Sequence, residues 1–226
     1  MSLEEYIYSE IKNAIFNRKI PLNSQLNEEL LSEAFEVSRT PIRAVLKKLQ
    51  YEKIVQSIPN KGTYIYQPTK KDIQDVFQLR VILEKESIKL ACKTATEEQI
   101  KELEELTIKE EEYFKKGEYG KGIEFTSNFH QKLLMLSGNE FMARYNQELI
   151  NITNIYLAFH DTAKKESSDS PEEHRVILNA LRERDVEASV KAVEKHFENI
   201  NKHLNFEQNN LDVTFSNIFK PYNKKK

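Results

Sequence analysis

The stretch Glu28–Gln50 constrains the fold of this chain most strongly. It reads EELLSEAFEVSRTPIRAVLKKLQ and contains two short helical patterns separated by a turn at Val37. In each pattern the apolar residues recur at helical spacing and share one face. In chain order these residues are Leu30, Leu31, Ala34 and Phe35, then Ile42, Val45, Leu46 and Leu49. The stretch therefore predicts two packed helices, the second of which begins after Ser38 as its N-cap.

The outward side of the second helix is cationic. Its residues are Arg39, Thr40, Arg43, Lys47 and Lys48, and no acidic residue follows until Glu52. A helix that is apolar on one side and cationic on the other is typical of a helix-turn-helix whose second helix enters the DNA major groove. We therefore expect this helix to contact double-stranded DNA. An arginine near its start can pair bidentately with guanine.

A β-hairpin is predicted directly after these helices. Two apolar or alternating runs, 54–58 and 63–67, flank Pro59, Asn60, Lys61 and Gly62. Gly62 permits a positive φ or a close backbone approach, and Asn60 and Lys61 can reach phosphate or a minor-groove edge. The hairpin thus has the position of a wing.

The segment VSRTPIRAVLKKL and the wing-like PNKGTYI, Pro59–Ile65, together resemble the winged helix-turn-helix of the GntR family of bacterial transcription regulators. The resemblance spans about residues 6–66. It departs from the family at turns and on one helix surface, at Asn23, Ser24, Glu36, Ala44 and Lys53. The resemblance and the cationic pattern together assign the DNA-binding residues as Ser38, Arg39, Thr40, Arg43, Lys47, Lys48, Asn60, Lys61 and Gly62.

The length of 226 residues predicts two domains of ordinary size. Five glycines and six prolines leave few breaks, so the composition favours helix. From Thr69 onward every segment reads as helix, over 70–93, 97–115, 119–136, 139–163, 171–183 and 185–206. We therefore expect a mainly α protein with a winged helix-turn-helix at 1–68, an all-helical bundle at 69–206 and a tail at 207–226.

Charge and hydropathy exclude several classes of protein. Residues 1–68 carry nine Lys or Arg against eight Asp or Glu, so DNA affinity must come from local placement and not from bulk charge. No stretch approaches the roughly 20 apolar residues of a membrane span, and MSLEEYIYSE lacks the apolar core of a signal peptide. We expect no membrane contact and a cytoplasmic location. The single cysteine, Cys92, is expected as a buried thiol.

The segment DVFQLRVILEKESIKLA resembles the opening of the FCD ligand-binding domain found in the FadR branch of the GntR family. The resemblance implies a homodimer and a small-molecule effector, and it makes Arg80 a candidate partner for an effector carboxylate. The alternative is an ordinary intrahelical ion pair between Arg80 and Glu84, one helical turn apart, worth about 0.3–0.5 kcal/mol.

Three further segments, NFHQKLLMLSGN, EEHRVILNAL and ASVKAVEKHF, resemble the places where the FCD family supplies histidines to a divalent metal. Their histidines are His130, His174 and His196. Helical geometry supports the last pair independently: if the chain turns between Arg184 and Asp185, His174 and His196 lie at nearly equal height on antiparallel helices.

The fourth ligand that the resemblance implies, an aspartate, is Thr126 here. Three histidines with water or an effector carboxylate would still satisfy zinc or nickel, and manganese is the third candidate. Alternatively, the histidines are polar pocket residues that hydrogen-bond an organic ligand. Thr126 and His160 are assigned to the effector pocket. His203, one heptad after His196 and so on the same stripe of the helix, is a further candidate participant in the histidine site, although the family has no ligand there.

The hypothesis that follows is a ligand-responsive DNA-binding repressor, not an enzyme. Two alternatives stay open: a three-histidine metalloenzyme, for which Glu172 and Glu173 lie near His174, and a pure metal sensor. The charge-rich cluster Glu102–Glu112 is expected to be a solvated helix face, and Lys224–Lys226 a solubilising end.

Overall fold

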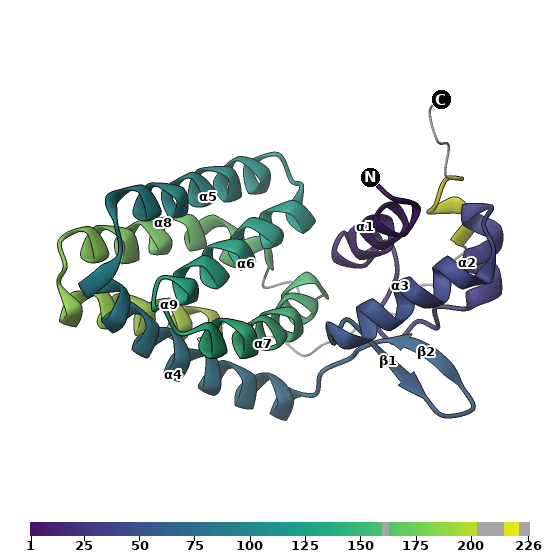
Figure 1. The fold of residues 1–226 in the computed structure, drawn as a ribbon, viewed down its shortest axis with the longest axis horizontal. Helices are drawn as coiled ribbons and strands as arrows, with labels where there is room; N and C mark the ends of the chain where they lie inside the picture. The colour runs from purple at the N-terminus through teal and green to yellow at the C-terminus, as the bar shows by residue number, and fades with distance from the viewer. Residues whose placement is uncertain (160–162, 203–214, 222–226) are drawn as a thin grey trace. The chain divides into compact units, whose positions relative to one another are not determined.

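A computed structural model describes residues 1–159, 163–202 and 215–221. The chain divides into two compact units (Figure 1). The first unit comprises Met1–Gln67 and Gln208–Lys226, and the second comprises Pro68–Glu207. The predicted mainly α fold with a small β-hairpin is confirmed.

The first unit is built on three helices, α1 (Leu3–Phe16), α2 (Glu28–Phe35) and α3 (Arg39–Tyr51). Helix α3 packs against α1 and α2 through the apolar stripes that the sequence predicts. The side chains that meet there are fully buried, and they include Ile7, Ile11, Leu31, Ile42 and Leu49. Burial of side chains this large is worth about 1.5–3 kcal/mol each, which fixes the orientation of α3.

The predicted wing is present as β1 (Val55–Ile58) and β2 (Gly62–Ile65), an antiparallel pair. Gly62 has φ +102°, and a side chain there would come within 2.9 Å of the Gln25 amide nitrogen. The positive φ and the close approach that were expected at Gly62 are therefore both present. Gln25 donates to the Lys61 carbonyl at 2.8 Å, so the turn of the wing is fixed to the chain before α2.

Five described residues of the first unit other than glycine have positive φ, and three of them concern the GntR resemblance. These three, Asn23, Glu36 and Lys53, have φ of 59°, 55° and 60°. Each lies where the GntR resemblance departs from a glycine. Left-handed backbone is disfavoured for residues with a Cβ, by roughly 1–2 kcal/mol, and asparagine tolerates it best. These turns therefore keep the backbone conformation of a glycine turn, and the residues that replace glycine carry the steric strain of their Cβ atoms.

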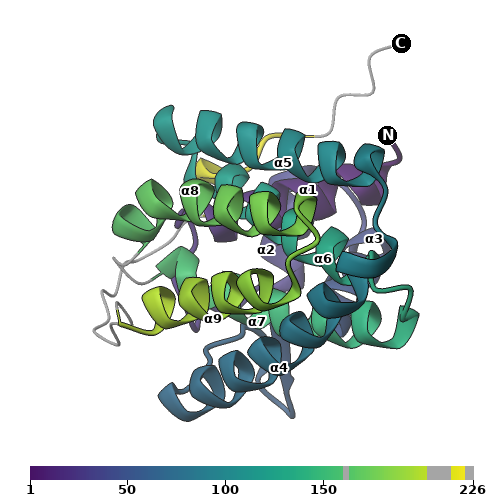
Figure 2. The same ribbon diagram turned by 90° about the vertical axis from the view of Figure 1, so that its left-hand side faces the viewer.

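The second unit is an all-helical bundle of α4 (Lys70–Thr94), α5 (Glu97–Lys115), α6 (Tyr119–Met135), α7 (Glu140–Phe159), α8 (Ala163–Arg182) and α9 (Val186–Lys202). Figure 2 shows α5, α8 and α9 lying side by side, and α4 packs against α6, α7 and α9. Thr69 caps α4 in a capping box with Asp72, as expected from the sequence. Cys92 is buried in the core, also as expected.

Helix α8 differs from the sequence prediction. It begins at Ala163 rather than near residue 171, so Pro171 lies inside the helix. The preceding residues are mostly polar and give no apolar periodicity, which is why the pattern did not reveal the extra turns. The turn after α8 does fall where expected, with Arg184 in the left-handed conformation.

Part of the C-terminal tail is ordered against the first unit. A 3₁₀ turn, η1 (Phe215–Asn217), contacts α2. Lys224–Lys226 lie outside the described residues. Within the described part of the chain, no helix combines the length and apolarity needed to cross a bilayer.

Candidate nucleic-acid interface and candidate metal centre

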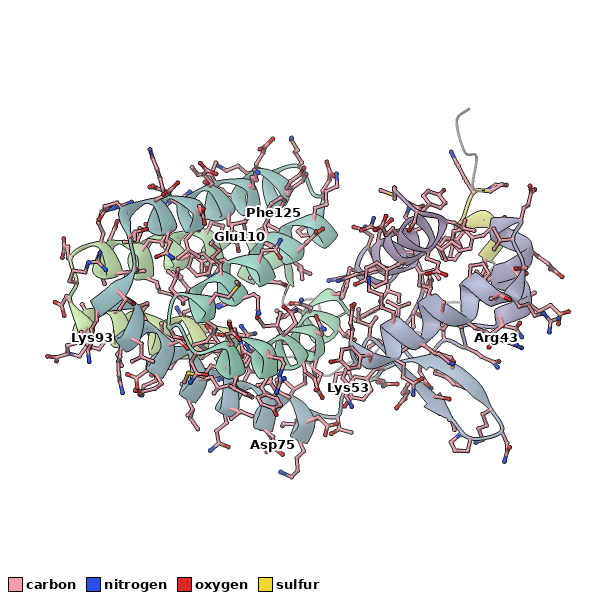
Figure 3. The ribbon with its side chains drawn as sticks, viewed as in Figure 1. Arg43, Lys53, Asp75, Lys93, Glu110 and Phe125 are labelled. Atoms are coloured by element: carbon pink, nitrogen blue, oxygen red, sulfur yellow. The ribbon has the colours of Figure 1, made fainter. Side chains whose placement is uncertain are left out.

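The cationic residues of α3 are exposed, as the sequence predicts. Arg39, Arg43 and Lys47 follow one another at intervals of four residues and share one edge of the helix. Figure 3 labels Arg43 where it projects from α3. This edge can present three cations to DNA at once.

Both arginines are held by carboxylates of α2. Arg39 pairs with Glu29 and Arg43 with Glu28, each at 2.6 Å. All four side chains are more than one-third exposed, so water and salt screen the pairs. Such pairs contribute about 0–1 kcal/mol, and the arginines can therefore exchange them for phosphate or guanine at little cost.

Lys48 is placed differently from the other cations. It lies nine residues after Arg39, two and a half helical turns, which puts it on the opposite side of α3. Its ammonium sits 3.9 Å from the ring centre of Tyr8 on α1. This cation–π contact directs Lys48 toward α1 and away from the edge that carries Arg39.

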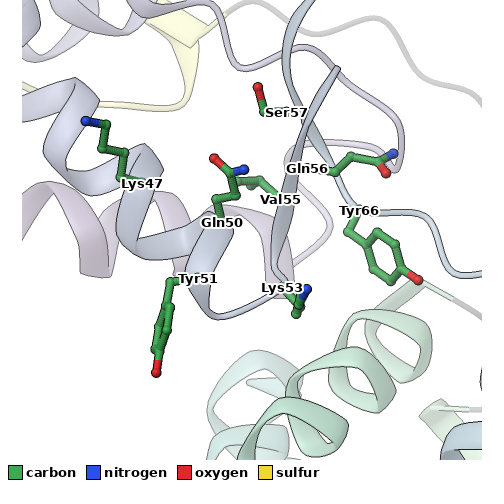
Figure 4. Close-up of a pocket in the computed structure, with 8 residues that line it drawn as sticks. All are labelled: Lys47, Gln50, Tyr51, Lys53, Val55, Gln56, Ser57 and Tyr66. Atoms are coloured by element: carbon green, nitrogen blue, oxygen red, sulfur yellow. The ribbon is translucent and has the colours of Figure 1, made fainter. Parts of the chain in front are cut away.

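The remaining predicted contacts lie at the two ends of this surface. Ser38 occupies the N-cap position of α3, but its side chain makes no capping hydrogen bond. Asn60 and Lys61 are exposed at the tip of the wing, next to Gly62, and Thr40 is exposed on the first turn of α3. Between α3 and β1 lies an open hollow, lined by Lys47, Lys53 and the six other residues in Figure 4.

The three predicted histidines meet in the core of the second unit. His130 comes from α6, His174 from α8 and His196 from α9, and all are at most 2% exposed. The ring centres of His174 and His196 lie 4.9 Å apart, as the turn arithmetic predicts, and each lies 5.1 Å or less from that of His130. One ligand atom from each histidine lies within 4.8 Å of the others.

Each histidine has a carboxylate on its Nδ1 atom. Glu84 of α4 binds His130, Glu110 of α5 binds His174, and Glu173 of α8 binds His196, all at 2.7 Å. An ionised carboxylate only accepts hydrogen bonds, so each Nδ1 carries the proton. Each Nε2 of a neutral ring is then a bare lone pair, which is the state that ligates a metal.

These lone pairs lack a hydrogen donor. His130 Nε2 and His196 Nε2 face each other at 3.3 Å, and His174 Nε2 is buried with no hydrogen-bond partner in the structure. Two nitrogens bound tetrahedrally to zinc at about 2.0–2.1 Å lie roughly 3.3 Å apart. The His130–His196 pair therefore has the spacing of a zinc site, and the three ligand atoms, all within 4.8 Å of one another, are a donor set that fits a divalent cation. We call His130, His174 and His196 with their three glutamates the histidine cluster.

Burial sets the charge of the histidine cluster. It lowers the pKa of His130 to about 3 and also lowers the pKa of His196, so both rings are neutral at pH 7. Burial alone would raise the pKa values of Glu84 and Glu110. Neighbouring basic groups and the hydrogen bonds that each carboxylate accepts outweigh it and lower both pKa values, which keeps these carboxylates ionised.

Glu110 corrects one expectation. The cluster Glu102–Glu112 is not solvated throughout, because Glu110 is fully buried and faces the bundle interior (Figure 3). Besides His174, it accepts hydrogen bonds from the hydroxyls of Thr126 and Ser170, both at 2.7 Å. Thr126 thus reaches the histidine cluster through Glu110. A spacing signal existed, since Ile100, Leu103 and Glu110 share one helix face.

The pair Arg80–Glu84 is buried and not on the surface. Its side chains are 3% and 1% exposed, and the closest nitrogen–oxygen distance is 2.8 Å. Arg80 also donates to Thr153 on α7 at 2.9 Å. It therefore belongs to the same network as His130, through their shared partner Glu84.

Sequence reasoning missed that Glu84, Glu110 and Glu173 each bind a histidine. Glu84 appeared as a partner of Arg80 alone, and Glu173 as a possible general base. Glu173 instead binds His196 and accepts a hydrogen bond from Asn199, so it orients a histidine. Glu172 pairs with Arg175 at an exposed position. His160 and His203 lie outside the described residues.

Comparison with known proteins identifies both units. Residues 3–65 match the family described as "Bacterial regulatory proteins, gntR family", and residues 75–199, more than half of the chain, match the FCD domain. The HTH-type transcriptional regulator YdhC of Bacillus subtilis is 26% identical over 198 residues, which cover 87% of this chain and 88% of that protein. The Nta operon transcriptional regulator of Aminobacter aminovorans is 28% identical over 180 residues, 78% of this chain and 84% of that protein.

Solved structures show the same fold. McbR/YncC of E. coli has a TM-score of 0.72 at 20% identity, covering 90% of this chain and 97% of that one. A GntR regulator from Rhodococcus has a TM-score of 0.76 at 18% identity, covering 90% and 98%. These families and relatives are transcription regulators and not enzymes. The chain belongs to the GntR family of bacterial transcription regulators, with an FCD domain as its second unit.

Proposed function

We propose that this regulator is a repressor that binds a near-palindromic operator as a homodimer, in response to a small carboxylate that binds beside a divalent metal. The observation that carries the proposal is the set of three buried Nε2 atoms, each bare because a glutamate holds the opposite ring nitrogen. Such a set is suited to a divalent cation, and three protein ligands leave an open position for an exchangeable one.

In the proposed DNA complex, Arg39 and Arg43 read base edges, while Thr40, Lys47 and Lys61 hold phosphates. Ser38, Asn60 and Gly62 approach the backbone from the start of α3 and the tip of the wing. Lys48 is left out of this interface because it lies against Tyr8, on the other side of α3.

The DNA-binding assignment is tested with Arg43→Ala on an operator selected from random duplexes. Loss of one bidentate guanine contact costs about 1–3 kcal/mol per site, and a dimer loses two, so specific binding should fall by at least about thirtyfold. Lys48→Ala is the matched control and should bind nearly as the parent does. Undiminished specific binding by Arg43→Ala would sink the assignment.

For the metal we propose zinc, nickel or manganese on His130, His174 and His196. Bound there, the ion would supply a Lewis-acidic centre that accepts an anionic oxygen. Thr126 has no carboxylate that could supply this oxygen, and its hydroxyl already donates to Glu110. The fourth position is thereby open to a carboxylate from solution.

Elemental analysis of protein purified without chelator tests the metal. We expect about one metal per chain, lost in His174→Ala and kept in Val176→Ala, a control at an exposed position of the same helix. No metal in the parent protein would mean that the histidines serve as hydrogen-bond partners of an organic ligand instead.

We propose Arg80 as the second contact of the effector. Its guanidinium donates some of its N–H groups to Glu84 and Thr153 and has further N–H groups that can donate to an added carboxylate. The Gluconate operon transcriptional repressor of Bacillus licheniformis, 22% identical over 199 residues, is named for an operon of a hydroxycarboxylate, which supports this class of effector. Metal-dependent operator binding that no carboxylate alters would favour a pure metal sensor.

A homodimer is supported by exposed apolar side chains on two helices that pack together. Leu79 and Ile82 of α4 and Phe141 and Tyr145 of α7 are 45–64% exposed. Patches of this kind mark protein interfaces. Ile82→Glu should shift sedimentation from dimer to monomer, whereas Ile108→Glu, on α5, should not.

That the protein represses transcription, and does not activate it, is proposed from its relatives. The HTH-type transcriptional repressor RspR of E. coli K12 is 24% identical over 202 residues, 88% of each chain. A repressor of this kind acts where the DNA is, in the cytoplasm. Deletion of the gene should therefore raise transcription from the operator's promoter.

A further inference from the structure

The end of α2 carries an aromatic site that two distant parts of the chain cover. Phe35, the last residue of α2, is fully buried. Its ring lies 6.3 Å from that of Tyr6 on α1, edge to face. The other cover is Phe219, whose ring is stacked on Phe35 at 4.7 Å with an interplanar angle of 27°.

The covering segment is a short turn that exposes little of its apolar surface. Phe215 and Phe219 are 7% and 4% exposed, and their ring centres lie 6.1 Å apart. The Phe219 amide donates to the Phe215 carbonyl at 3.0 Å, so one turn places both rings on the same side. A single turn is not stable alone in water, so packing against α2 must supply its order.

Sequence composition sets the turn apart from the segment before it. The residues between α9 and the turn, HLNFEQNNLDVT, are mostly polar, whereas both phenylalanines of the turn are buried. Stacked aromatic pairs contribute about 0.5–1.5 kcal/mol beyond the area that they bury. Without the turn, Phe35 would lose its stacked partner at a site next to α3.

The connectivity gives the contact a second consequence. The chain passes from the first unit to the second at Gln67–Pro68 and returns at Glu207–Gln208. Helix α9, which carries His196, ends at Lys202, and Phe215 follows thirteen residues later. Residues 203–214 lie outside the described residues, so the described turn is where the C-terminal segment rejoins the first unit.

We infer that Phe215–Phe219 is an integral part of the DNA-binding unit, and that α2 depends on the docking of this turn on Phe35 for its order, although the turn follows the whole second unit in the sequence.

Hydrogen exchange on the full chain and on a chain ending at residue 214 tests the docking without DNA, metal or effector. Loss of two buried phenylalanines should speed exchange of the α2 amides on the order of a hundredfold while leaving α5 unchanged. A chain ending at residue 222 is the matched control and should exchange as the full chain does. Equal α2 exchange in all three would overturn the docking.

Phe219→Ala in the full-length protein covers the case in which the shorter chain does not fold. It should accelerate α2 exchange in the same direction, and Lys220→Ala, at an exposed neighbour, should not. No difference between these two variants would likewise overturn the docking.

Discussion

The α2–α3 surface and the histidine cluster both pair carboxylates with basic side chains, at nearly the same distances. Glu28–Arg43 and Glu29–Arg39 are 2.6 Å apart, and Glu84–His130 and Glu110–His174 are 2.7 Å apart. The first two pairs are 37–61% exposed, whereas the other two are at most 3% exposed. Burial, and not distance, separates the two regions.

That difference matches what each region has to do. Exposed pairs cost little to break, so the arginines of α3 can change partners when DNA arrives. A buried carboxylate that loses its partner costs several kcal/mol, so the glutamates of the histidine cluster keep each ring in one orientation. The four predictions below test this contrast, from the largest expected effect to the smallest.

Glu110→Ala should be the most damaging change. It leaves the His174 Nδ1–H and two hydroxyls without their acceptor in a dry site. We expect the free energy of unfolding to fall by about 3–5 kcal/mol, measured by urea titration. Glu112→Ala, two residues away and exposed, should leave the urea midpoint unchanged. Similar midpoints for the two variants would contradict the contrast between buried and exposed carboxylates.

Acid should destabilise the second unit next most strongly. His130 and His196 have lowered pKa values in the folded state, so below the ordinary pKa of 6.5 the unfolded chain binds protons that the folded chain does not, down to about pH 3 for His130. Stability is therefore lost as the pH falls, by roughly 1 kcal/mol per pH unit for each histidine.

Urea titrations of metal-free protein between about pH 7 and pH 5 measure this slope, and the carboxylates add to it only below their ordinary pKa of 4.5. His130→Asn should flatten the slope. Stability that is constant or rises toward pH 5 would argue against neutral, buried imidazoles.

Glu28→Gln and Glu29→Gln should have a smaller effect, and on binding rather than stability. Removing the carboxylates frees Arg39 and Arg43 and takes negative charge away from the DNA surface. Affinity for random-sequence duplex should rise roughly twofold to tenfold, with a steeper dependence on salt. Fluorescence anisotropy measures it, with Glu33→Gln as the control on the same helix. An unchanged affinity would show that the ion pairs do not compete with DNA.

The smallest effect concerns the left-handed turns of the first unit. Lys53→Gly should stabilise the protein by at most about 1 kcal/mol, because glycine removes the steric cost at φ 60° but adds entropy to the unfolded chain. Ala44→Gly, inside α3, is the matched control and should destabilise by a similar amount. Thermal melts report both. A loss of stability in Lys53→Gly would mean that the lysine side chain outweighs the strain.

The helices and the hairpin follow from apolar periodicity, which burial enforces directly. The segment 97–115, for instance, has the bounds of α5. The sequence could predict that His174 and His196 lie close together, because one tight turn between antiparallel helices fixes their positions along the helix axes. It could not predict that His130 joins them, because His130 lies on α6, 44 residues before His174. For His130 only the family resemblance gave the prediction.

The glutamates behind the histidines were harder to find. Glu110 stands in a run of acidic residues, and its chemistry does not distinguish it from Glu111 or Glu112; its register with Leu103 does. Phe215 and Phe219 were missed for a different reason. Two phenylalanines in one turn give no periodicity, and what orders them is Phe35, 180 residues earlier in the chain.

The aromatic site on α2 also affects how the protein is made. Because the first unit takes residues from both ends of the chain, a ribosome releases the last of them only after the whole second unit has been synthesised. The second unit can fold while the stacked partner of Phe35 is still missing. A polypeptide that terminates within the second unit would thus lack this partner and have a less stable DNA-binding unit.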